Sequence, residues 1–574
     1  MPIATIDVAR LEPRLKKLYG SRADEAAALI KQRIESASLE PVTRPSLSDS
    51  SWDESDVVLI TYGDQIRSTE TPPLQTFRTF LQRYDLPSLT NTIHFLPFFP
   101  FSSDDGFSVI DYRRIDPYVG DWRDVHQIGA MCNLMFDFVV NHISQQSLWF
   151  RGYLSGKSPY DNYFIEASPD DDLSQVTRPR SLPLLSDYET SRGTKWLWTT
   201  FSRDQIDLNL QTPAVLAELI EILVEYARHG ARIIRLDAIA YLWKQIGTSC
   251  IHLSQTHEVV KLFRDVLETV APETLILTET NVPHRENMSY FGDGDEAHMI
   301  YQFSLPPLIL DAFLNDDAQP LKRWLANLNA PPQGTTYFNF TASHDGIGVR
   351  PLEGHVDGPR LTSLVEKIKQ RGGLVSTRRE TDGTDTPYEL NISYVDALSP
   401  DVADDEVHVQ RFLASQALSL ALQGMPAIYF HSLVGTQNDY EGAKQSGVPR
   451  RINRRKFELN ELSTRIESTD NLAHHIFDGM RKLLATRIQQ PAFHPNANQR
   501  YIESNTDHIL CFERLCRRSG QQILVAINFS TSPQTCDIPT AYDDAVELLG
   551  SSVQPTNQRL ELAPAQIVWL ERRS

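Results

Sequence analysis

The chain has 574 residues, which is long enough for a large core and more than one domain. Hydrophobic residues make up 41% and charged residues 22%, as in ordinary globular proteins. The net charge of −19 argues against binding to nucleic acid or to an anionic membrane, because both repel an acidic surface. A small anionic substrate is not excluded, since a local cluster of arginines can bind one.

The five cysteines are odd in number and form no Cys-x-x-Cys motif. This pattern favours reduced thiols in a cytoplasmic protein over a disulfide framework. The first residues lack the basic segment and apolar core of a signal peptide. No apolar run is long enough to cross a bilayer.

Residues 1–50 are expected to form an N-terminal helical extension. Between Val8 and Ile34, apolar residues recur at intervals of three and four, as in an amphipathic helix. Pro13 and Gly20 are expected to divide this segment. Residues 46–51, rich in serine, are typical of a linker.

From there on, short apolar runs alternate with longer helical segments, which predicts an α/β fold with a parallel sheet. The runs number about eight, the count of a TIM (β/α)8 barrel. The expected strands are Val57–Tyr62, Thr92–Leu96, Leu134–Val140, Ile233–Asp237, Leu275–Glu279, Met299–Phe303, Thr335–Phe340 and Ala427–Phe430. One helix between them has clear end signals: Thr212 as a capping residue, Pro213 at its first position, and Gly230 after its end.

Two intervals are too long for a simple βα connection. We therefore expect the catalytic barrel to comprise residues 51–142 and 206–496, interrupted by an inserted domain at 143–205. A second insertion is expected at 350–395. Alternating runs after residue 497 predict a small C-terminal β-sandwich-like domain at 497–574.

Arg235 and Asp237 stand two residues apart at the end of an expected strand, so their side chains point to the same face. In a barrel, the C-terminal end of a strand faces the active site. We expect the arginine to keep the aspartate ionised, because a nearby cation favours a carboxylate. The alternative is a structural ion pair at a strand end.

Polar residues follow three other expected strands as well. They are Asn141 and His142, Glu279 and Asn281, and His344 and Asp345. Each group alone is equally compatible with turn residues or with a satisfied core histidine. Together, in this order on a barrel pattern, they predict an active site.

This set of motifs resembles the α-amylase superfamily of retaining glycoside hydrolases and transglycosidases, glycoside hydrolase family 13, and in particular its sucrose-phosphorylase branch. The resemblance covers about residue 52 to Arg454 and implies three catalytic roles. Asp237 matches the nucleophile, Glu279 the acid/base, and Asp345 the residue that stabilises the transition state. It implies no cofactor, and we assign no metal, although some relatives bind Ca²⁺ near the position of Asn141.

The same resemblance implies a set of substrate-binding positions. Those around the glucose are Asp104, Phe107, His142, Arg235, His344 and Arg454. Those toward the acceptor are Arg178, Arg180, Tyr241, Asn281, Tyr388 and Glu389, and Phe201 is a further substrate-binding position.

A retaining mechanism needs two carboxyl groups about 5–5.5 Å apart, one a nucleophile and one an acid that later becomes a base. Glu279 follows an apolar run, so a poorly solvated setting is expected to raise its pKa toward that of a working acid. The covalent glucosyl-enzyme intermediate can then be attacked by water or by another acceptor.

Phosphate as the acceptor requires local cations, and the Arg178-Pro179-Arg180 segment supplies two guanidinium groups. The segment resembles one in sucrose phosphorylases, where the second arginine lies by the acceptor site. The chain departs from sucrose phosphorylases at Glu389, where they have glutamine, and at Asn281, where they have histidine. These departures put sucrose in doubt as the substrate.

The segments 52–62 and 102–112, with the N-terminal extension, most resemble glucosylglycerate phosphorylases. This resemblance implies reversible phosphorolysis of 2-O-α-D-glucosylglycerate to α-D-glucose 1-phosphate and D-glycerate. The alternatives are a phosphorylase of sucrose, sucrose 6-phosphate or glucosylglycerol, an α-glucosidase, or a non-enzymatic amylase-like binding module. The expected partners are a sugar substrate and inorganic phosphate, and a homodimer is left open.

Overall fold

The computed structural model describes residues 7–36, 52–180, 182–379 and 384–573. Its centre is a closed barrel of eight parallel strands, joined in the order β1-β16-β12-β11-β10-β9-β4-β3. The strands are β1 (Val58–Thr61), β3 (Thr92–Phe95), β4 (Asn133–Val139), β9 (Ala231–Asp237), β10 (Leu275–Thr278), β11 (Met299–Tyr301), β12 (Thr336–Asn339) and β16 (Met425–Tyr429). All eight predicted strands are present, so the predicted TIM barrel is confirmed.

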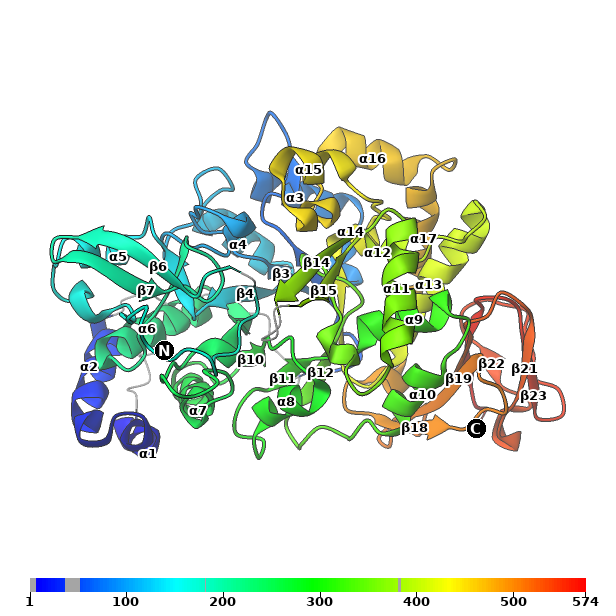
Figure 1. Cartoon of the computed structure of the whole chain (residues 1–574). Coiled ribbons are helices and arrows are strands. Elements are labelled where there is room, and N and C mark those ends of the chain that lie inside the picture. Colours follow the sequence, from blue (N-terminus) through cyan, green and yellow to red (C-terminus); the bar gives the residue numbers. More distant parts are fainter. Residues whose placement is uncertain (1–6, 37–51, 181, 380–383, 574) are drawn as a thin grey trace.

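Helices surround the barrel, as Figure 1 shows. The larger ones are α3 (Pro73–Arg83), α4 (Trp122–Gly129), α6 (Pro213–Arg228), α7 (Ser254–Val270), α9 (Leu305–Leu314), α10 (Gln319–Ala326), α13 (Asp405–Ala421), α16 (Leu459–Glu467) and α17 (Leu472–Arg487). Helix α6 begins at Pro213 and ends before Gly230, which has a φ of +100°. The expected capping bond of Thr212 is wrong, because its hydroxyl donates to the carbonyl of Asn162 at 3.0 Å instead.

The N-terminal extension forms two helices, α1 (Val8–Tyr19) and α2 (Ala23–Ser36), separated at Gly20 as predicted. The expected break at Pro13 is wrong. Helix α1 continues through it, because Leu11, Leu15 and Leu18 on both sides are buried and offset the lost backbone hydrogen bond. The predicted linker at 46–51 lies outside the described residues. Trp52, which follows it, is buried.

Ion pairs reinforce the packing of these two helices against the barrel helices. Arg14 pairs with Glu258 and Asp265 of α7, each at 3.3 Å, and Arg33 pairs with Glu221 of α6 at 2.8 Å. Figure 1 shows α1 and α2 at the opposite end of the molecule from the C-terminal strands.

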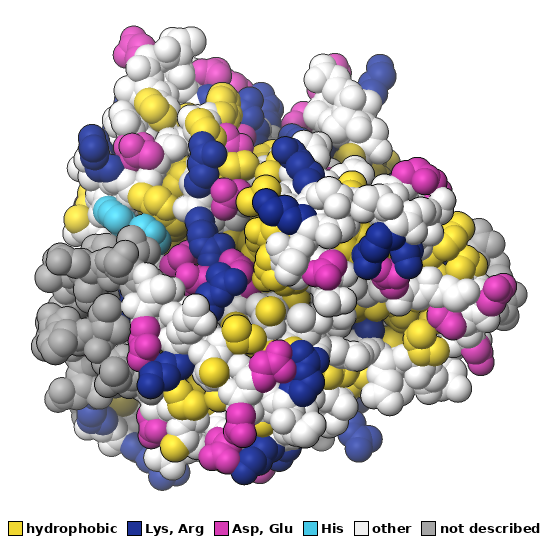
Figure 2. Space-filling model, turned by 90° about the vertical axis from the view of Figure 1, so that its left-hand side faces the viewer, with side chains coloured by type: hydrophobic (Ala, Val, Ile, Leu, Met, Phe, Trp, Pro, Cys, Tyr) yellow, Lys and Arg dark blue, Asp and Glu magenta, His cyan; other side chains and the backbone are white. Residues whose placement is uncertain are grey.

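On the face drawn in Figure 2, acidic and basic side chains are interspersed, and no patch of one sign stands out.

The segment between β4 and α6 contains α5 (Leu148–Leu154), the hairpin β6 (Leu185–Thr190) and β7 (Gly193–Trp198), and the pair β5 (His142–Ser144) and β8 (Gln205–Asp207). His142 lies opposite Asp207 in this pair. Both ends of the segment are therefore fixed beside the C-terminal end of β4.

A second group of elements follows β12. It contains a three-stranded sheet in the order β13 (Ile347–Gly348), β15 (Asp385–Asn391) and β14 (Leu374–Arg379), with helices α11 (Gly358–Gln370) and α12 (Tyr394–Ala397). Strand β15 carries Tyr388 and Glu389. The shorter elements α14 (Phe430–Leu433), α15 (Tyr440–Ser446) and η8 (Pro449–Asn453) follow β16.

The C-terminal strands form two layers. A five-stranded sheet contains β18 (Asn498–Ile502), β19 (Ile509–Leu515), β20 (Gln522–Asn528), β24 (Ile567–Glu571) and β22 (Val546–Glu547), and β21 (Gln534–Asp537) pairs with β23 (Arg559–Leu562). Side chains alternate along β20: Ile523 and Val525 join the main core, whereas Leu524 and Ala526 pack in a second, smaller core. The division of the chain into domains stays a prediction.

Among the described residues, no helix combines the length and apolar character needed to cross a membrane.

Gly424, directly before β16, offers a test of how tightly the barrel closes. Its φ is +137°, and an added Cβ would lie 2.7 Å from Nδ2 of Asn339 and 2.9 Å from the carbonyl oxygen of Tyr337. Gly424→Ala should cost about 2–6 kcal/mol of unfolding free energy, because about 1–3 kcal/mol of backbone strain adds to a similar overpacking cost.

Chemical denaturation measures this cost, with Gly447→Ala as the control. Gly447 also has a positive φ, of +66°, but no atom lies within 4 Å of the added Cβ. The control should lose only about 1–2 kcal/mol. Equal losses in the two variants would contradict the close packing at Gly424.

Candidate active site

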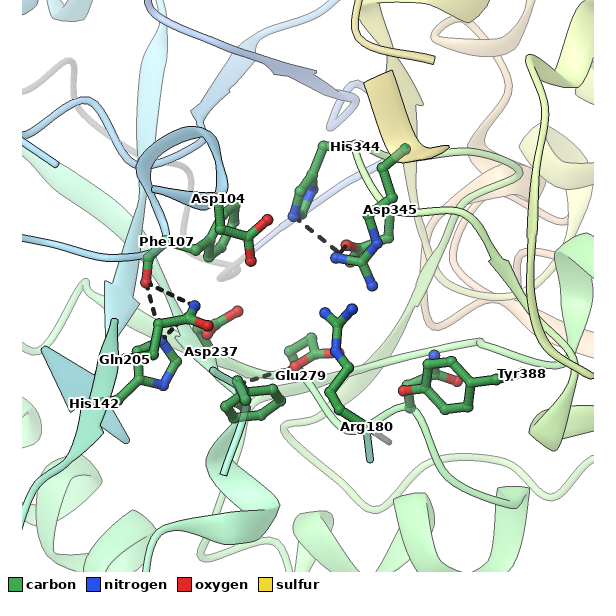
Figure 3. Close-up of a pocket in the computed structure, with 14 residues that line it drawn as sticks. Asp104, Phe107, His142, Arg180, Gln205, Asp237, Glu279, His344, Asp345 and Tyr388 are labelled. Atoms are coloured by element: carbon green, nitrogen blue, oxygen red, sulfur yellow. Dashed lines mark hydrogen bonds and ion pairs between the residues drawn. The ribbon is translucent and has the colours of Figure 1, made fainter. Parts of the chain in front are cut away.

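A polar cavity opens at the C-terminal ends of the barrel strands (Figure 3). Its lining contains most of the residues predicted as catalytic or substrate-binding. They are Asp104, Phe107, His142, Arg180, Phe201, Asp237, Glu279, Asn281, His344, Asp345 and Tyr388. Gln205, Ala238 and Arg450 also line it and were not predicted.

Asp237, the last residue of β9, is held from below by Arg235. The Nη1 atom of Arg235 donates to Oδ1 of Asp237 at 2.8 Å and also to Asp137 of the neighbouring strand β4. His94 of β3 contacts the other oxygen of Asp137 at 2.9 Å. Arg235 itself does not line the cavity, so the structure places it as a support for Asp237.

Glu279 lies one residue beyond β10, and its Oε2 accepts a hydrogen bond at 2.9 Å from the backbone N–H of Ala238. This N–H belongs to the residue directly after Asp237, so the two carboxyl groups are brought to adjacent parts of one cavity wall. Ala238 has a left-handed φ of +50°, which is uncommon for a residue with a side chain. Such strain is typical of functional sites.

Burial and charged neighbours raise the pKa of both carboxyl groups. Burial raises the pKa of Asp237, the Arg235 guanidinium opposes that rise, and the nearby Glu279 carboxylate adds to it. Burial also raises the pKa of Glu279, against the lowering effect of Arg235, and Asp345 adds to the rise. The pair therefore retains one proton more readily than two free carboxyls would.

Arg235 is expected to keep Asp237 ionised, and burial of the Asp237 carboxyl acts against it. Arg235 donates directly to Asp237, whereas Glu279 receives only a backbone N–H. A charge-assisted bond to a guanidinium stabilises a carboxylate more than a neutral donor does. This places the negative charge on Asp237 and the shared proton on Glu279.

Asp345 follows β12 and contacts cations. Arg450 lies at 2.6 Å and Arg454 at 3.9 Å from its Oδ1 atom. Burial alone would raise the pKa of Asp345, but Arg450 and its other neighbours hold that pKa well below the usual range. Asp345 is therefore ionised in the cavity.

Two histidines, His142 and His344, line the cavity. The ring of His344 stacks on Phe107 with centroids 4.6 Å apart, and Nε2 of His142 donates to the carbonyl of Phe107 at 2.9 Å. Burial lowers the pKa of both histidines, so both are neutral hydrogen-bonding groups.

Arg454 is buried and does not line the cavity. It donates to the carbonyl of His344 and to Asp105, each at 2.7 Å. Asp104 lies 3.7 Å from the same guanidinium. Arg454 thus ties the loop of Asp104 to the loop of His344.

On the acceptor side, Arg180, Phe201, Asn281 and Tyr388 line the cavity, and Tyr241 lines a small adjoining pocket. Figure 3 shows the Arg180 side chain directed into the space enclosed by Glu279, Asp345 and Tyr388. Within the part of the chain that the structure describes, Arg180 forms no ion pair and donates no hydrogen bond.

Two sequence-based expectations on this side are wrong. Arg178 does not pair with Arg180 in the cavity, because it is exposed and donates to the carbonyl of Leu182. Glu389 is buried and does not line the cavity. Its two oxygens accept from Arg450 at 2.8 and 2.9 Å.

The region around Asn141 holds a buried ammonium group. Lys244 lies 2.5 Å from both Asn141 and Asp207. Among the described residues, no group of three or more His, Cys, Asp or Glu side chains is arranged to hold a metal ion.

Comparison with known proteins agrees with this geometry. The family described as "Alpha amylase, catalytic domain" matches residues 89–372. The chain is 43% identical over 526 residues to the glucosylglycerate phosphorylase of Escherichia coli, which covers 91% of this chain and 92% of that protein. It is 47% identical to the glucosylglycerate phosphorylase of Spirochaeta thermophila, which covers 85% of this chain and 83% of that protein.

A solved structure is similar over most of the chain. The crystal structure of sucrose 6F-phosphate phosphorylase from Thermoanaerobacter thermosaccharolyticum has a TM-score of 0.72 and 26% identity, covering 86% of this chain and 96% of that one. These comparisons confirm the resemblance predicted from the motifs. The chain belongs to the glucosylglycerate phosphorylase family, which is built on the α-amylase type of catalytic domain.

Proposed function

We propose that the chain reversibly splits 2-O-α-D-glucosylglycerate with phosphate, giving α-D-glucose 1-phosphate and D-glycerate with retention at C1. The observation that carries the proposal is one cavity that combines Asp237, Glu279 and Asp345 with the guanidinium of Arg180, which has no ion-pair partner among the described residues. The identity of 43–47% to glucosylglycerate phosphorylases supports this choice of substrate.

In the first step, the Asp237 carboxylate attacks C1 of the glucosyl group. The bond from C1 to the glycerate oxygen breaks, and Glu279 gives its proton to that oxygen, so glycerate leaves as a neutral alcohol at its 2-position. Positive charge develops on the sugar ring in the transition state, and the ionised Asp345 stabilises it. The product is a β-glucosyl ester of Asp237.

In the second step, phosphate takes the place of glycerate. Glu279, now a carboxylate, accepts a proton from phosphate while a phosphate oxygen attacks C1 and the ester bond to Asp237 breaks. Two inversions at C1 give net retention. Both carboxyl groups return to their starting states.

Arg180 suits both acceptors, because glycerate carries a carboxylate and phosphate carries a similar set of anionic oxygens. The other lining arginine, Arg450, already contacts two carboxylates. We infer that glycerate and phosphate use Arg180 in turn, and that glycerate leaves before phosphate binds.

The proposal is tested by incubating the protein with glucosylglycerate and phosphate and measuring glucose 1-phosphate. Sucrose, sucrose 6-phosphate and glucosylglycerol serve as competing donors in the same assay. The highest kcat/KM is expected for glucosylglycerate. Release of free glucose without glucose 1-phosphate would instead identify an α-glucosidase, and no turnover of any donor would point to a binding module.

Arg180→Ala should raise the KM for phosphate and for glycerate together, by about 10- to 100-fold, since a hydrogen bond to a charged group contributes about 1.5–3 kcal/mol. Initial rates in both directions measure this change. Arg178→Ala is the matched control two residues away, and its exposed guanidinium predicts a KM close to wild type. A larger effect at Arg178 than at Arg180 would refute the assignment.

Glu279→Gln should lower kcat for glucosylglycerate by about 10²–10⁴-fold, because the departing glycerate oxygen no longer receives a proton. The rate depends on protonated Glu279, so wild-type activity should fall as pH rises through the raised pKa of Glu279. It should also fall as pH drops and Asp237 becomes protonated.

In Glu279→Gln, the fall of activity at high pH should disappear. α-Glucosyl fluoride should restore the first step, because fluoride leaves without a proton. A Glu279→Gln variant with an unchanged high-pH limb would show that another group is the acid.

We also propose a cytoplasmic location, for which the five free, buried cysteines are the support. The oligomeric state is open to measurement by light scattering.

A further inference from the structure

One guanidinium group joins two loops at the cavity. Arg450, in η8, contacts Asp345 through Nη1 at 2.6 Å and Glu389 of β15 through Nη2 and Nε at 2.8 and 2.9 Å. The bond to Glu389 is bidentate, the geometry in which a guanidinium holds a carboxylate most firmly. The side chains of Arg450 and Glu389 are only 13% and 2% exposed, so water screens these contacts little.

Glu389 is locked in this position by its backbone and its packing. It lies opposite Gly348 in the β13–β15 pair. A Cβ added at Gly346, the residue after Asp345, would lie only 2.5 Å from Cγ of Glu389. Glu389 therefore packs on the loop that carries Asp345, whereas its neighbour Tyr388 lines the cavity.

The charges of the three groups determine what Asp345 can do. A guanidinium bound to Asp345 alone would cancel most of the negative potential that a positively charged transition state needs. Because Arg450 is shared with Glu389, the three groups keep one net negative charge. The same sharing saturates Arg450 with carboxylates and leaves Arg180 as the lining arginine that an acceptor anion can neutralise.

We propose that Arg450 is a positioning residue for Asp345, and that Glu389 acts through Arg450, not as a ligand of the acceptor. The pair Arg450–Glu389 orients the Asp345 carboxylate and keeps it ionised and net negative toward the sugar. It also fixes β15, and with it Tyr388, at the cavity wall. This inference deepens the proposed function and rests on it for the role of Asp345.

Other charged and titratable groups also face Asp345 and contribute to its ionisation. They are His344 in its own loop, Arg454 in the loop after η8, Arg235 and Asp237 of β9, and Glu279 after β10. These stay unchanged in the variants below. Any shift in the pH profile is therefore assigned to Arg450 or Glu389.

The experiment uses α-glucosyl fluoride as the donor and phosphate as the acceptor, because this reaction depends on the glucosyl-transfer machinery and not on glycerate. Arg450→Gln should lower kcat by about 10²–10³-fold, the usual effect of losing one electrostatic contribution to a transition state, with a smaller change in KM. Asp345 then loses its nearest cation, and its uncompensated charge raises the pKa of Asp237 further, so the low-pH limb of kcat, which Asp237 sets, should move up by about 1 pH unit.

Two further variants separate charge from geometry. Arg450→Lys keeps the positive charge, so its low-pH limb should stay near wild type, but kcat should recover only in part because lysine cannot bind Glu389 in a bidentate manner. Glu389→Gln should lower kcat without moving the low-pH limb upward, since Arg450 then acts on Asp345 alone. Arg455→Gln is the control, because Arg455 pairs with the half-exposed Glu461 at 2.6 Å, away from the cavity.

The inference is overturned if Arg450→Gln and Glu389→Gln both keep the kcat and the pH profile of the wild type. It is also overturned if the loss of kcat in each variant equals its loss of folded protein. If Arg450→Gln does not fold, wild-type kcat in both Arg450→Lys and Glu389→Gln would overturn it. A wild-type protein that turns over α-glucosyl fluoride but makes no glucose 1-phosphate from glucosylglycerate refutes the proposed substrate alone. Failure of both reactions overturns both proposals.

Discussion

The contact between Arg235 and Asp237 is the interaction on which the site depends. Two carboxyl groups, Asp237 and Glu279, are buried at the end of a closed barrel, where burial favours the protonated form of each. The hydrogen bond of 2.8 Å from Arg235 to Asp237 makes the two carboxyl groups unequal, because it favours the ionised form of Asp237. One carboxyl can then act as a nucleophile while the other holds a proton, which is the asymmetry that glycosyl transfer with retention requires.

The arginines in and around the cavity differ in their partners. Arg235, Arg450 and Arg454 each contact carboxylates of the protein, and these contacts orient the catalytic groups. Arg180 differs, because it points into the cavity without an acidic partner among the described residues. An acidic protein with a net charge of −19 can thus attract an anionic acceptor to one place.

Sequence alone predicted the barrel and the three carboxyl residues, because both leave local signals: apolar runs of strand length followed at once by polar residues. Features that depend on distant partners were missed. Arg450 meets Glu389 across 61 positions of sequence, and nothing near either residue signals the pair. Arg178 and Arg180 lie in a segment without regular structure, so spacing could not tell which one faces the cavity. Burial of Asp237, which opposes Arg235, is likewise a property of the folded barrel.

In the proposed mechanism, Asp237 becomes covalently attached to glucose while Glu279 donates and then accepts the proton. The most direct measurement is mass spectrometry of the Glu279→Gln variant after mixing with α-glucosyl fluoride, followed by digestion and sequencing of the labelled peptide. We expect one added glucosyl group, attached to Asp237, which phosphate does not remove quickly. A glucosyl group on any other residue, or an unlabelled protein despite fluoride release, would contradict it.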